Sequence, residues 1–165
     1  MPNDVTVGPD GAVYVSDTCH AVVRRVNATT GAIEDTLNFD IDTEGGANGL
    51  SFGPEGDLWI TTENAVLFCG IAGDFNAPVS GLYRVSVDGG SFGEAEAVAT
   101  GVGQFGDGLV FDSEGNLYVV FDILEGSDFS SQLLVLPAGG TELLPFLSLA
   151  DRILANVVFG VGEYG

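Results

Sequence analysis

The sequence predicts an all-β fold, a piece of a β-propeller built from four-stranded units, and three observations lead to this fold class. The chain has 165 residues, the usual size of one domain. Its 25 glycines separate short runs of β-branched and aromatic residues, which is the pattern of many strands joined by tight turns. The third observation is that one segment of the chain occurs three times.

The repeated segments decide the architecture. They cover residues 3–15, 48–60 and 107–119, and they align without a gap. In each of them an apolar strand is followed by an acidic residue and a glycine, which supplies the positive φ of a tight hairpin. A second strand follows, with Tyr14, Trp59 or Tyr118 at its centre. Because these aromatic residues hold the same place in every repeat, we expect them to pack between neighbouring units.

Two further strands complete each unit. We predict them at 22–26 and 32–37 in the first unit, at 82–87 and 95–99 in the second, and at 132–136 and 142–146 in the third. A four-stranded meander that repeats at this length along a chain is a propeller blade. The expected blades therefore cover residues 3–40, 48–102 and 107–147, and a next blade is expected to start at 155–165.

Two segments depart from the repeat. Residues 64–80 form an inserted loop in the second unit, which either caps a propeller face or is a tolerated surface insertion. Near the end of the chain, Leu147, Ala150, Ile153 and Leu154 follow a helical spacing. This spacing predicts a short helix over 147–154.

Three blades and part of a fourth do not close a ring, since propellers have about four to eight blades. An open stack leaves sheet faces without the neighbour that buries them. The sequence therefore predicts that missing blades, or self-association of copies of the chain, complete the propeller.

The charge excludes several classes of partner. The chain has 24 acidic residues and 4 arginines, with no lysine, and a net charge of −20. Such a surface repels phosphate backbones, which argues against nucleic-acid binding, and it disfavours anionic membrane surfaces. No apolar run approaches the roughly 18 residues of a membrane-spanning helix. Divalent cations, by contrast, would be attracted.

The cellular compartment stays open. An acidic surface suits a high-salt environment, and it also suits an exported protein of ordinary acidic composition. No basic segment followed by an apolar one, typical of a signal peptide, begins the chain, and an extracellular or periplasmic location is favoured over the cytoplasm. Cys19 and Cys69 form one disulfide in an oxidising compartment or stay as two free thiols, and both interpretations stand.

The beginnings of the repeats resemble a known family. The runs P-N-D at 2–4, A-N-G-L at 47–50 and G-D-G-L at 106–109, each followed by a strand and an acidic-Gly turn, look like the senescence-marker-protein/gluconolactonase (regucalcin-like) family. That family folds as a six-bladed propeller, which implies that this chain covers about half of one. The D-T run at 17–18 with the strand at 22–26 is also similar to the NHL propeller repeat.

The resemblance implies a metal site. In that family, two asparagines and an aspartate at the starts of innermost strands hold a divalent cation, together with a glutamate from an earlier blade. The matching residues are Asn3, Asn48 and Asp107. The glutamate has no counterpart, so we expect weak binding by this chain alone. Ca²⁺ is the first choice for such oxygen donors, with Mg²⁺, Mn²⁺ or Zn²⁺ as alternatives. Alternatively, these are loop residues that bond their own backbone.

The resemblance also implies an activity. A cation with open positions polarises a lactone or ester carbonyl, and Asp107 would be the catalytic residue that handles the proton. The implied function is hydrolysis of small lactones or related esters. The alternative is a non-catalytic, NHL-like propeller that binds a protein or another ligand. In that case we expect the three side chains to diverge and an apolar or aromatic patch to be exposed.

Overall fold

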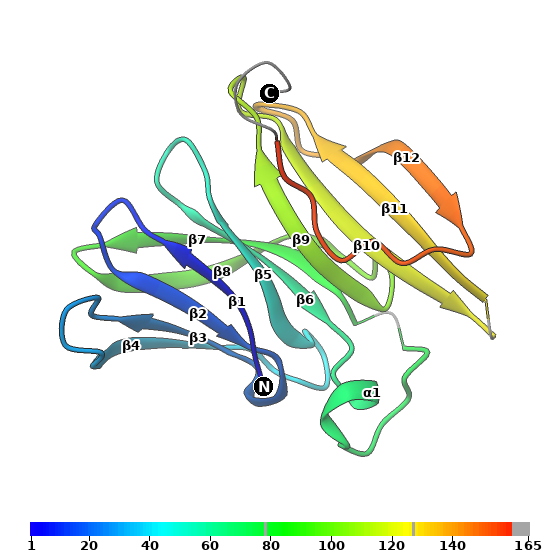
Figure 1. Cartoon of the computed structure of the whole chain (residues 1–165), viewed down its shortest axis with the longest axis horizontal. Helices are drawn as coiled ribbons and strands as arrows, with labels where there is room; N and C mark the ends of the chain where they lie inside the picture. Colours follow the sequence, from blue (N-terminus) through cyan, green and yellow to red (C-terminus); the bar gives the residue numbers. More distant parts are fainter. Residues whose placement is uncertain (78, 127, 160–165) are drawn as a thin grey trace.

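The computed structural model describes residues 1–77, 79–126 and 128–159, and these residues are mostly β-strand. The strands form three antiparallel meanders that lie side by side in chain order (Figure 1). The first meander contains β1 (Pro2–Val7), β2 (Val13–Asp17), β3 (Val22–Val26) and β4 (Ile33–Asn38). The second contains β5 (Gly46–Phe52), β6 (Leu58–Glu63), β7 (Gly81–Asp88) and β8 (Ser91–Thr100). The third contains β9 (Phe105–Phe111), β10 (Leu117–Glu125), β11 (Asp128–Leu136) and β12 (Leu144–Ala150). The predicted all-β fold class is confirmed.

The pairing within each meander follows chain order. The first meander is a separate sheet with the order β1-β2-β3-β4. The second and third meanders are joined by one pair, Glu63 of β6 with Phe105 of β9, into a larger sheet. The acidic-Gly turns have the expected geometry, with Gly11, Gly56 and Gly115 at φ values of 78°, 90° and 85°. The repeated segment therefore forms the first hairpin of every meander.

The hydrophobic core lies between the meanders. One cluster joins the first and second meanders and includes Tyr14, Leu58 and Ile60, and another joins the second and third. The ring of Tyr14 is fully buried and meets Phe52 of the second meander edge-on, at 4.9 Å between centroids. Trp59 meets Phe111 of the third meander in the same way. Tyr14 and Trp59 thus pack between neighbouring units, as predicted.

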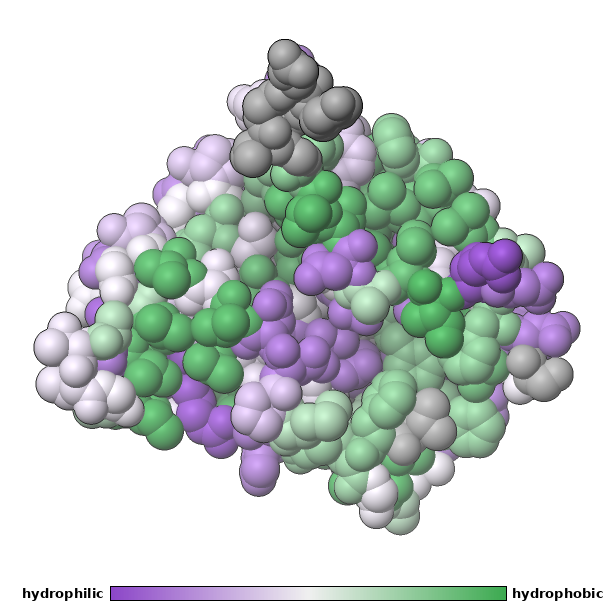
Figure 2. All heavy atoms as spheres, in the orientation of Figure 1, coloured by the Kyte–Doolittle hydropathy of each residue, from purple (hydrophilic) through white to green (hydrophobic). Residues whose placement is uncertain are grey.

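The two ends of this stack are open within the described residues. Val5 and Val7 of β1 are 61% and 65% exposed, whereas Leu50 and Leu109, at the repeat position of Val5, are 5% and 6% exposed. At the other end, β12 exposes Leu144, Phe146 and Leu147. Figure 2 shows hydrophobic surface over the first and third meanders, with hydrophilic surface between them. We call the side of the first meander that carries Val5 and Val7 the first open face.

The structure corrects the prediction for the end of the chain. The helix predicted over 147–154 is wrong, because β12 runs to Ala150 and pairs with β11, Leu147 lying opposite Leu133. Pairing along β11 satisfies the main chain there, and it outweighs the helical spacing of a few apolar residues. Of the next blade expected at 155–165, residues 155–159 are in no strand, and residues 160–165 lie outside the described residues. No helix among the described residues has the length and apolarity to cross a membrane.

The inserted loop is tied to the first meander. It carries the short helix α1 (Val66–Cys69), and Cys69 forms a disulfide with Cys19 of the 3₁₀ turn that follows β2. Of the two alternatives for the cysteines, the structure therefore shows the disulfide and not two free thiols. Asn64 holds the loop by donating from Nδ2 to the carbonyl oxygens of Asp74 and Ala77, at 2.9 and 3.0 Å.

Candidate functional site

The first strands of the three meanders meet at one cavity. It has a volume of about 200 Å³. We call it the hub cavity, and it is lined by Asn3, Asp4, Asn48, Gly49, Asp107, Gly108, Ala155 and Asn156. The structure thus places Asn3 of β1, Asn48 of β5 and Asp107 of β9 around the same space. Asn156, which begins the last repeat-like run of the chain, also reaches it.

Two glycines let the strands approach this closely. A β-carbon on Gly49 would lie 2.4 Å from the carbonyl oxygen of Asp107, and one on Gly108 would lie 2.1 Å from Oδ1 of Asn156. Both distances are far below van der Waals contact, so only glycine fits at these positions. The first meander has Asp4 at the equivalent position, and its carboxylate accepts a hydrogen bond from the amide of Leu50 at 2.8 Å.

Thr61 fixes the main chain beside Asp107. The amide of Gly49 donates to Oγ1 of Thr61 at 2.8 Å, and this hydroxyl donates to the carbonyl oxygen of Asp107 at 2.6 Å. On the other side, the amide of Gly108 donates to the carbonyl oxygen of Ala155 at 3.2 Å. The second meander and the end of the chain therefore both hold the start of β9 in place.

The half-buried carboxyl of Asp107 is electrostatically strained. Burial raises its pKa to about 7, and the nearby negative charges of Asp122 and Asp4 add to this effect. The amide of Gly108 acts in the opposite direction, because it donates to the carboxylate and stabilises the charged form. A carboxyl of this kind exchanges its proton near neutral pH.

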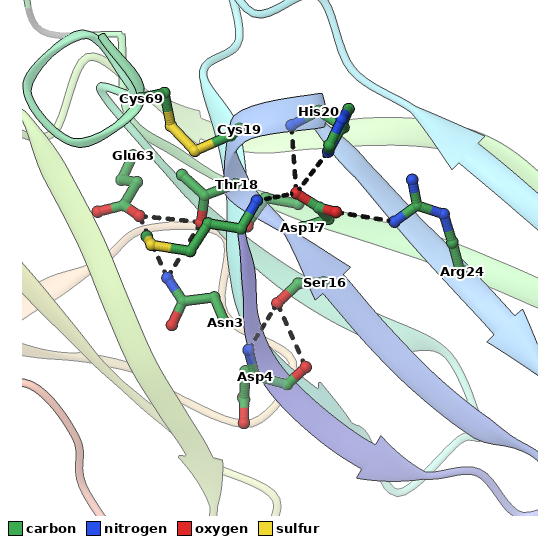
Figure 3. Close-up of polar contacts among 12 residues, drawn as sticks. Asn3, Asp4, Ser16, Asp17, Thr18, Cys19, His20, Arg24, Glu63 and Cys69 are labelled. Atoms are coloured by element: carbon green, nitrogen blue, oxygen red, sulfur yellow. Dashed lines mark hydrogen bonds and ion pairs between the residues drawn. A yellow bond between two sulfur atoms is a disulfide. The ribbon is translucent and has the colours of Figure 1, made fainter.

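Glu63, at the end of β6, is a site residue that the sequence reasoning missed. It is 5% exposed, and its Oε1 accepts hydrogen bonds from Oγ1 of Thr18 at 3.0 Å and from Nδ2 of Asn3 at 3.2 Å (Figure 3). Burial raises the pKa of Glu63 to about 7, and the charge of Asp107 adds to this effect. Hydrogen bonds with the side chains of Thr18, Asn48 and Asn3 act in the opposite direction and lower the pKa. A second carboxyl thus lies beside the hub cavity.

A signal for Glu63 was present in the repeat. Thr18, Glu63 and Asp122 are separated by the same two spacings as Asn3, Asn48 and Asp107. Two of these three positions carry a carboxyl, and both carboxyls lie near the hub, because Glu63 bonds Asn3 and the charge of Asp122 acts on Asp107. In the third meander, Asp122 accepts from the hydroxyl of Ser131 and from the amide of Leu154.

The hub carboxyls have no basic partner. Within the described part of the chain, neither Glu63, Asp107 nor Asp122 forms an ion pair with an arginine, the histidine or the N-terminus. A buried carboxylate without a counter-charge is costly. Asp17 shows the contrast: burial raises its pKa, but hydrogen bonds from the amino group of Met1, from His20 and from Arg24 outweigh this and hold it well below its usual range (Figure 3).

The donors at the hub are oxygens of two kinds. The described residues contain no group of three or more His, Cys, Asp and Glu side chains placed to hold a metal ion. Any cation here would depend on the amide oxygens of Asn3 and Asn48 together with the carboxylate of Asp107. Such hard donors fit Ca²⁺, Mg²⁺ or Mn²⁺ better than softer metals.

Comparison with known proteins rests on structure. No family model matches the sequence, and no curated protein matches it. A luciferin-regenerating enzyme matches with a TM-score of 0.63 at 15% identity, over 98% of this chain and 50% of its own. A gluconolactonase from Xanthomonas campestris matches with a TM-score of 0.57 at 15% identity, over 96% of this chain and 65% of its own. A virginiamycin B lyase from Staphylococcus aureus, solved with quinupristin, matches with a TM-score of 0.55 at 17% identity, over 88% of this chain and 40% of its own.

These matches concern the fold. The chain spans between 40% and 65% of the length of these three proteins, and at such low identity the likeness extends to architecture and not to chemistry. Three successive meanders packed face to face around a hub are the architecture of a propeller. The chain therefore has the β-propeller fold found in gluconolactonase-like proteins.

Proposed function

We propose that this chain is part of a metal-dependent hydrolase of lactones or related esters, with the hub cavity as its active site. The observation that carries the proposal is the arrival of Asn3, Asn48 and Asp107 at one cavity from equivalent positions of three repeats. A gluconolactonase shares this fold, and it is the reason that we propose lactones and related esters as the substrate class.

The residues fit a divalent cation. Asn3, Asn48 and Asp107 would hold it through oxygen atoms, the donors that hard cations prefer, and the buried carboxyls of Glu63 and Asp107 would attract it, since no basic side chain pairs with them in the described residues. We propose Ca²⁺ first, with Mg²⁺, Mn²⁺ and Zn²⁺ as alternatives. A bound cation would supply Lewis-acid polarisation of the carbonyl.

The proton is handled by Asp107. In the cation-free chain the pKa of Asp107 is about 7; a bound cation would favour the charged carboxylate, which is the form that acts as a general base. The carboxylate of Asp107 accepts a proton from the attacking water, whose oxygen bonds to the lactone carbonyl carbon. The same proton then passes to the ring oxygen as the C–O bond of the lactone breaks. Asn3 and Asn48 would contribute by holding the cation in the cavity through their amide oxygens.

We propose that further blades complete the ring. The first open face carries Val5, whose repeat equivalents Leu50 and Leu109 are buried, and Val7, whose equivalents Phe52 and Phe111 are partly buried. A neighbouring blade, from additional chain or from a second copy, would cover this face and close the hub around the cavity.

The alternative is a non-catalytic, NHL-like propeller that binds a protein or another ligand. The hydrophobic residues exposed at both ends of the stack favour it. This alternative places binding on the open ends, so a change in the hub would leave binding intact. The hydrolase places function at the hub, so the two proposals differ in their response to substitution of Asp107.

Hydrolysis of sugar lactones and aryl esters, followed by acid release, tests the enzyme. The full chain is treated with a chelator, and Ca²⁺, Mg²⁺, Mn²⁺ or Zn²⁺ is then added back. Asp107→Asn should lower the rate by about 10²-fold or more, whereas Asp88→Asn, an exposed carboxyl on β7, should leave it unchanged. Equal rates for the two variants, or no metal-dependent hydrolysis, would contradict the proposal.

A further inference from the structure

Glu63 and Asn3 form a hydrogen bond between two meanders. They are 60 residues apart in the sequence, on β6 and β1, and the bond runs from Nδ2 of Asn3 to Oε1 of Glu63. Figure 3 shows the amide nitrogen of Asn3 turned toward Glu63 and the amide oxygen turned away from it. The buried side chain of Glu63 in the second meander thus accepts a hydrogen bond from the exposed side chain of Asn3 in the first.

The chemistry of the pair selects one orientation of the amide. A carboxylate accepts hydrogen bonds and donates none, whereas an asparagine amide donates from one side and accepts on the other. The NH₂ group of Asn3 therefore faces Glu63. Because Asn3 also lines the hub cavity, its Oδ1 is the polar atom left for a ligand there.

We propose that Glu63 is a positioning residue, which turns Oδ1 of Asn3 into the hub cavity so that it serves as a donor to a divalent cation. The proposal rests on the hub being a cation site, as argued under the proposed function. Glu63 would act through Asn3 and need not touch the cation.

The support behind Glu63 is rigid. Thr18, fully buried, donates to Oε1 of Glu63 at 3.0 Å, and the carbonyl oxygen of Ala47 also lies within hydrogen-bond distance of this hydroxyl, at 3.1 Å. A β-carbon on Gly46 would lie 2.3 Å from the carbonyl oxygen of Thr18, so the second meander packs directly against this turn. A donor held by such a support keeps its geometry within the narrow limits that ligand binding needs.

The placement of Glu63 works against stability in the absence of a cation. It is buried, and no ion pair with a basic side chain is found for it in the described ranges. Replacement of such a carboxylate by an apolar side chain of similar size relieves the cost of burying a charge. Thr18 would keep Ala47 as an acceptor, and Nδ2 of Asn3 would keep only the hydroxyl of Thr18, at 3.0 Å. A hydroxyl both donates and accepts, so by itself it does not select one orientation of the amide. Glu63→Met should therefore stabilise the metal-free protein and weaken cation binding, whereas a purely structural role predicts a loss of both.

Calorimetric titration of the full chain with Ca²⁺ and Mn²⁺, at about pH 8 where Glu63 is ionised, tests the proposal. Failure of the unaltered chain to bind either cation overturns the cation site itself, whatever Glu63 does. If it binds, Glu63→Met should weaken the affinity by about 10-fold or more, the usual effect of removing a group that orients a metal ligand. Its melting temperature in chelator should be higher than that of the unaltered chain.

A double-mutant cycle separates orientation from charge. Asn3→Asp presents two acceptor oxygens, so its orientation no longer matters, and Glu63→Met should not weaken binding in this background. Asp122→Asn is the charge control, because Asp122 is buried at the repeat position of Glu63 but bonds Ser131 and Leu154 and not a hub asparagine. It should weaken binding less than Glu63→Met does.

Three outcomes would overturn the positioning role. These are unchanged affinity in Glu63→Met, an equal loss of affinity with and without Asn3→Asp, and a loss in Asp122→Asn as large as in Glu63→Met. Glu63→Gln keeps one acceptor oxygen and the shape of the side chain, so it serves if Glu63→Met does not fold. Because that oxygen can still accept from Nδ2 of Asn3, Glu63→Gln should keep the affinity of the unaltered chain. A loss of about 10-fold would overturn the positioning role, since it would assign the effect to the charge of Glu63.

Discussion

The first and second meanders have similar first hairpins but different surroundings. Leu50 of the second meander is buried against the first, whereas Val5, at the same repeat position, is 61% exposed. The local strands, turns and apolar residues are alike, so the difference comes from the neighbour. Repeat proteins of this kind owe much of their stability to the interfaces between units, and none of the described residues forms such an interface at the first open face.

The largest expected effect comes from removing the covalent link between the first and second meanders. The Cys19–Cys69 disulfide joins the first meander to the inserted loop of the second and closes a loop of 50 residues. Replacement of both cysteines by serine should lower the free energy of unfolding by about 4 kcal/mol, since the unfolded chain gains the entropy that the closed loop denied it. Urea unfolding measures this. The unaltered chain in reductant should match the variant, and a loss confined to the variant would point to packing at Cys19 and Cys69 as the cause.

The next effect compares equivalent side chains. Leu50→Ala should cost about 2–3 kcal/mol, because it leaves a cavity between two meanders. Val5→Ala should change the free energy of unfolding by less than about 0.5 kcal/mol, as expected at an exposed site. The same urea experiment serves both variants. If Val5→Ala proves as costly as Leu50→Ala, the first open face is covered in solution. A cost that depends on protein concentration would mean that a second copy covers it, and a cost that does not would mean that another segment of the same chain does.

The free energy of unfolding should depend on pH in opposite directions for the hub carboxyls and for Asp17. Glu63 and Asp107 have pKa values of about 7 in the folded chain, against ordinary values of 4.5 and 3.8. Between these limits the folded state binds more protons than the unfolded state, so the free energy of unfolding should rise as the pH falls from about 7 toward 4.5, by an amount on the order of a few kcal/mol. The lowered pKa of Asp17 has the opposite sign, since its contribution is lost only as the pH falls below its ordinary value of 3.8.

Urea unfolding in chelator over this pH range checks the hub contribution. Glu63→Gln should flatten the dependence, because the substituted side chain does not titrate. An equally steep dependence in Glu63→Gln would assign the effect to other carboxyls.

The smallest effect is expected at the surface of the second meander. Arg84 pairs with Asp57 at 2.5 Å and lies over the ring of Trp59, but its side chain is 41% exposed. Solvent screens such a pair, so Arg84→Met should cost less than about 1 kcal/mol. Measured in about 1 M NaCl, where exposed charges are further screened, the cost should shrink. A cost that salt leaves unchanged would assign the role of Arg84 to its packing on Trp59.

The repeat made most of the fold predictable, because each unit forms its own hairpins from neighbouring residues. The strands, the acidic-Gly turns and the packing of Tyr14 and Trp59 all follow from local patterns. The error at 147–154 arose where pairing with β11 decides the structure and the apolar spacing fits a helix as well.

The features that the sequence left open depend on contacts between distant segments. Whether Cys19 meets Cys69 is decided by the path of the inserted loop. Glu63 went unnoticed because its partners Asn3 and Thr18 belong to another meander. Only the periodic spacing of Thr18, Glu63 and Asp122 could have pointed to it, and that spacing becomes informative once Glu63 is known to lie beside the hub.

The glycines at the hub have a consequence for how such a protein diversifies. The strand β9 at Gly49, and the segment around Asn156 at Gly108, lie so close that even one methyl group would force the neighbouring main chains apart. The width of the hub cavity is therefore set by the main chain, and substitutions at these two positions cannot adjust it gradually. New binding preferences would have to arise in the loops around the rim, which leaves the inner strands free to stay constant while the periphery changes.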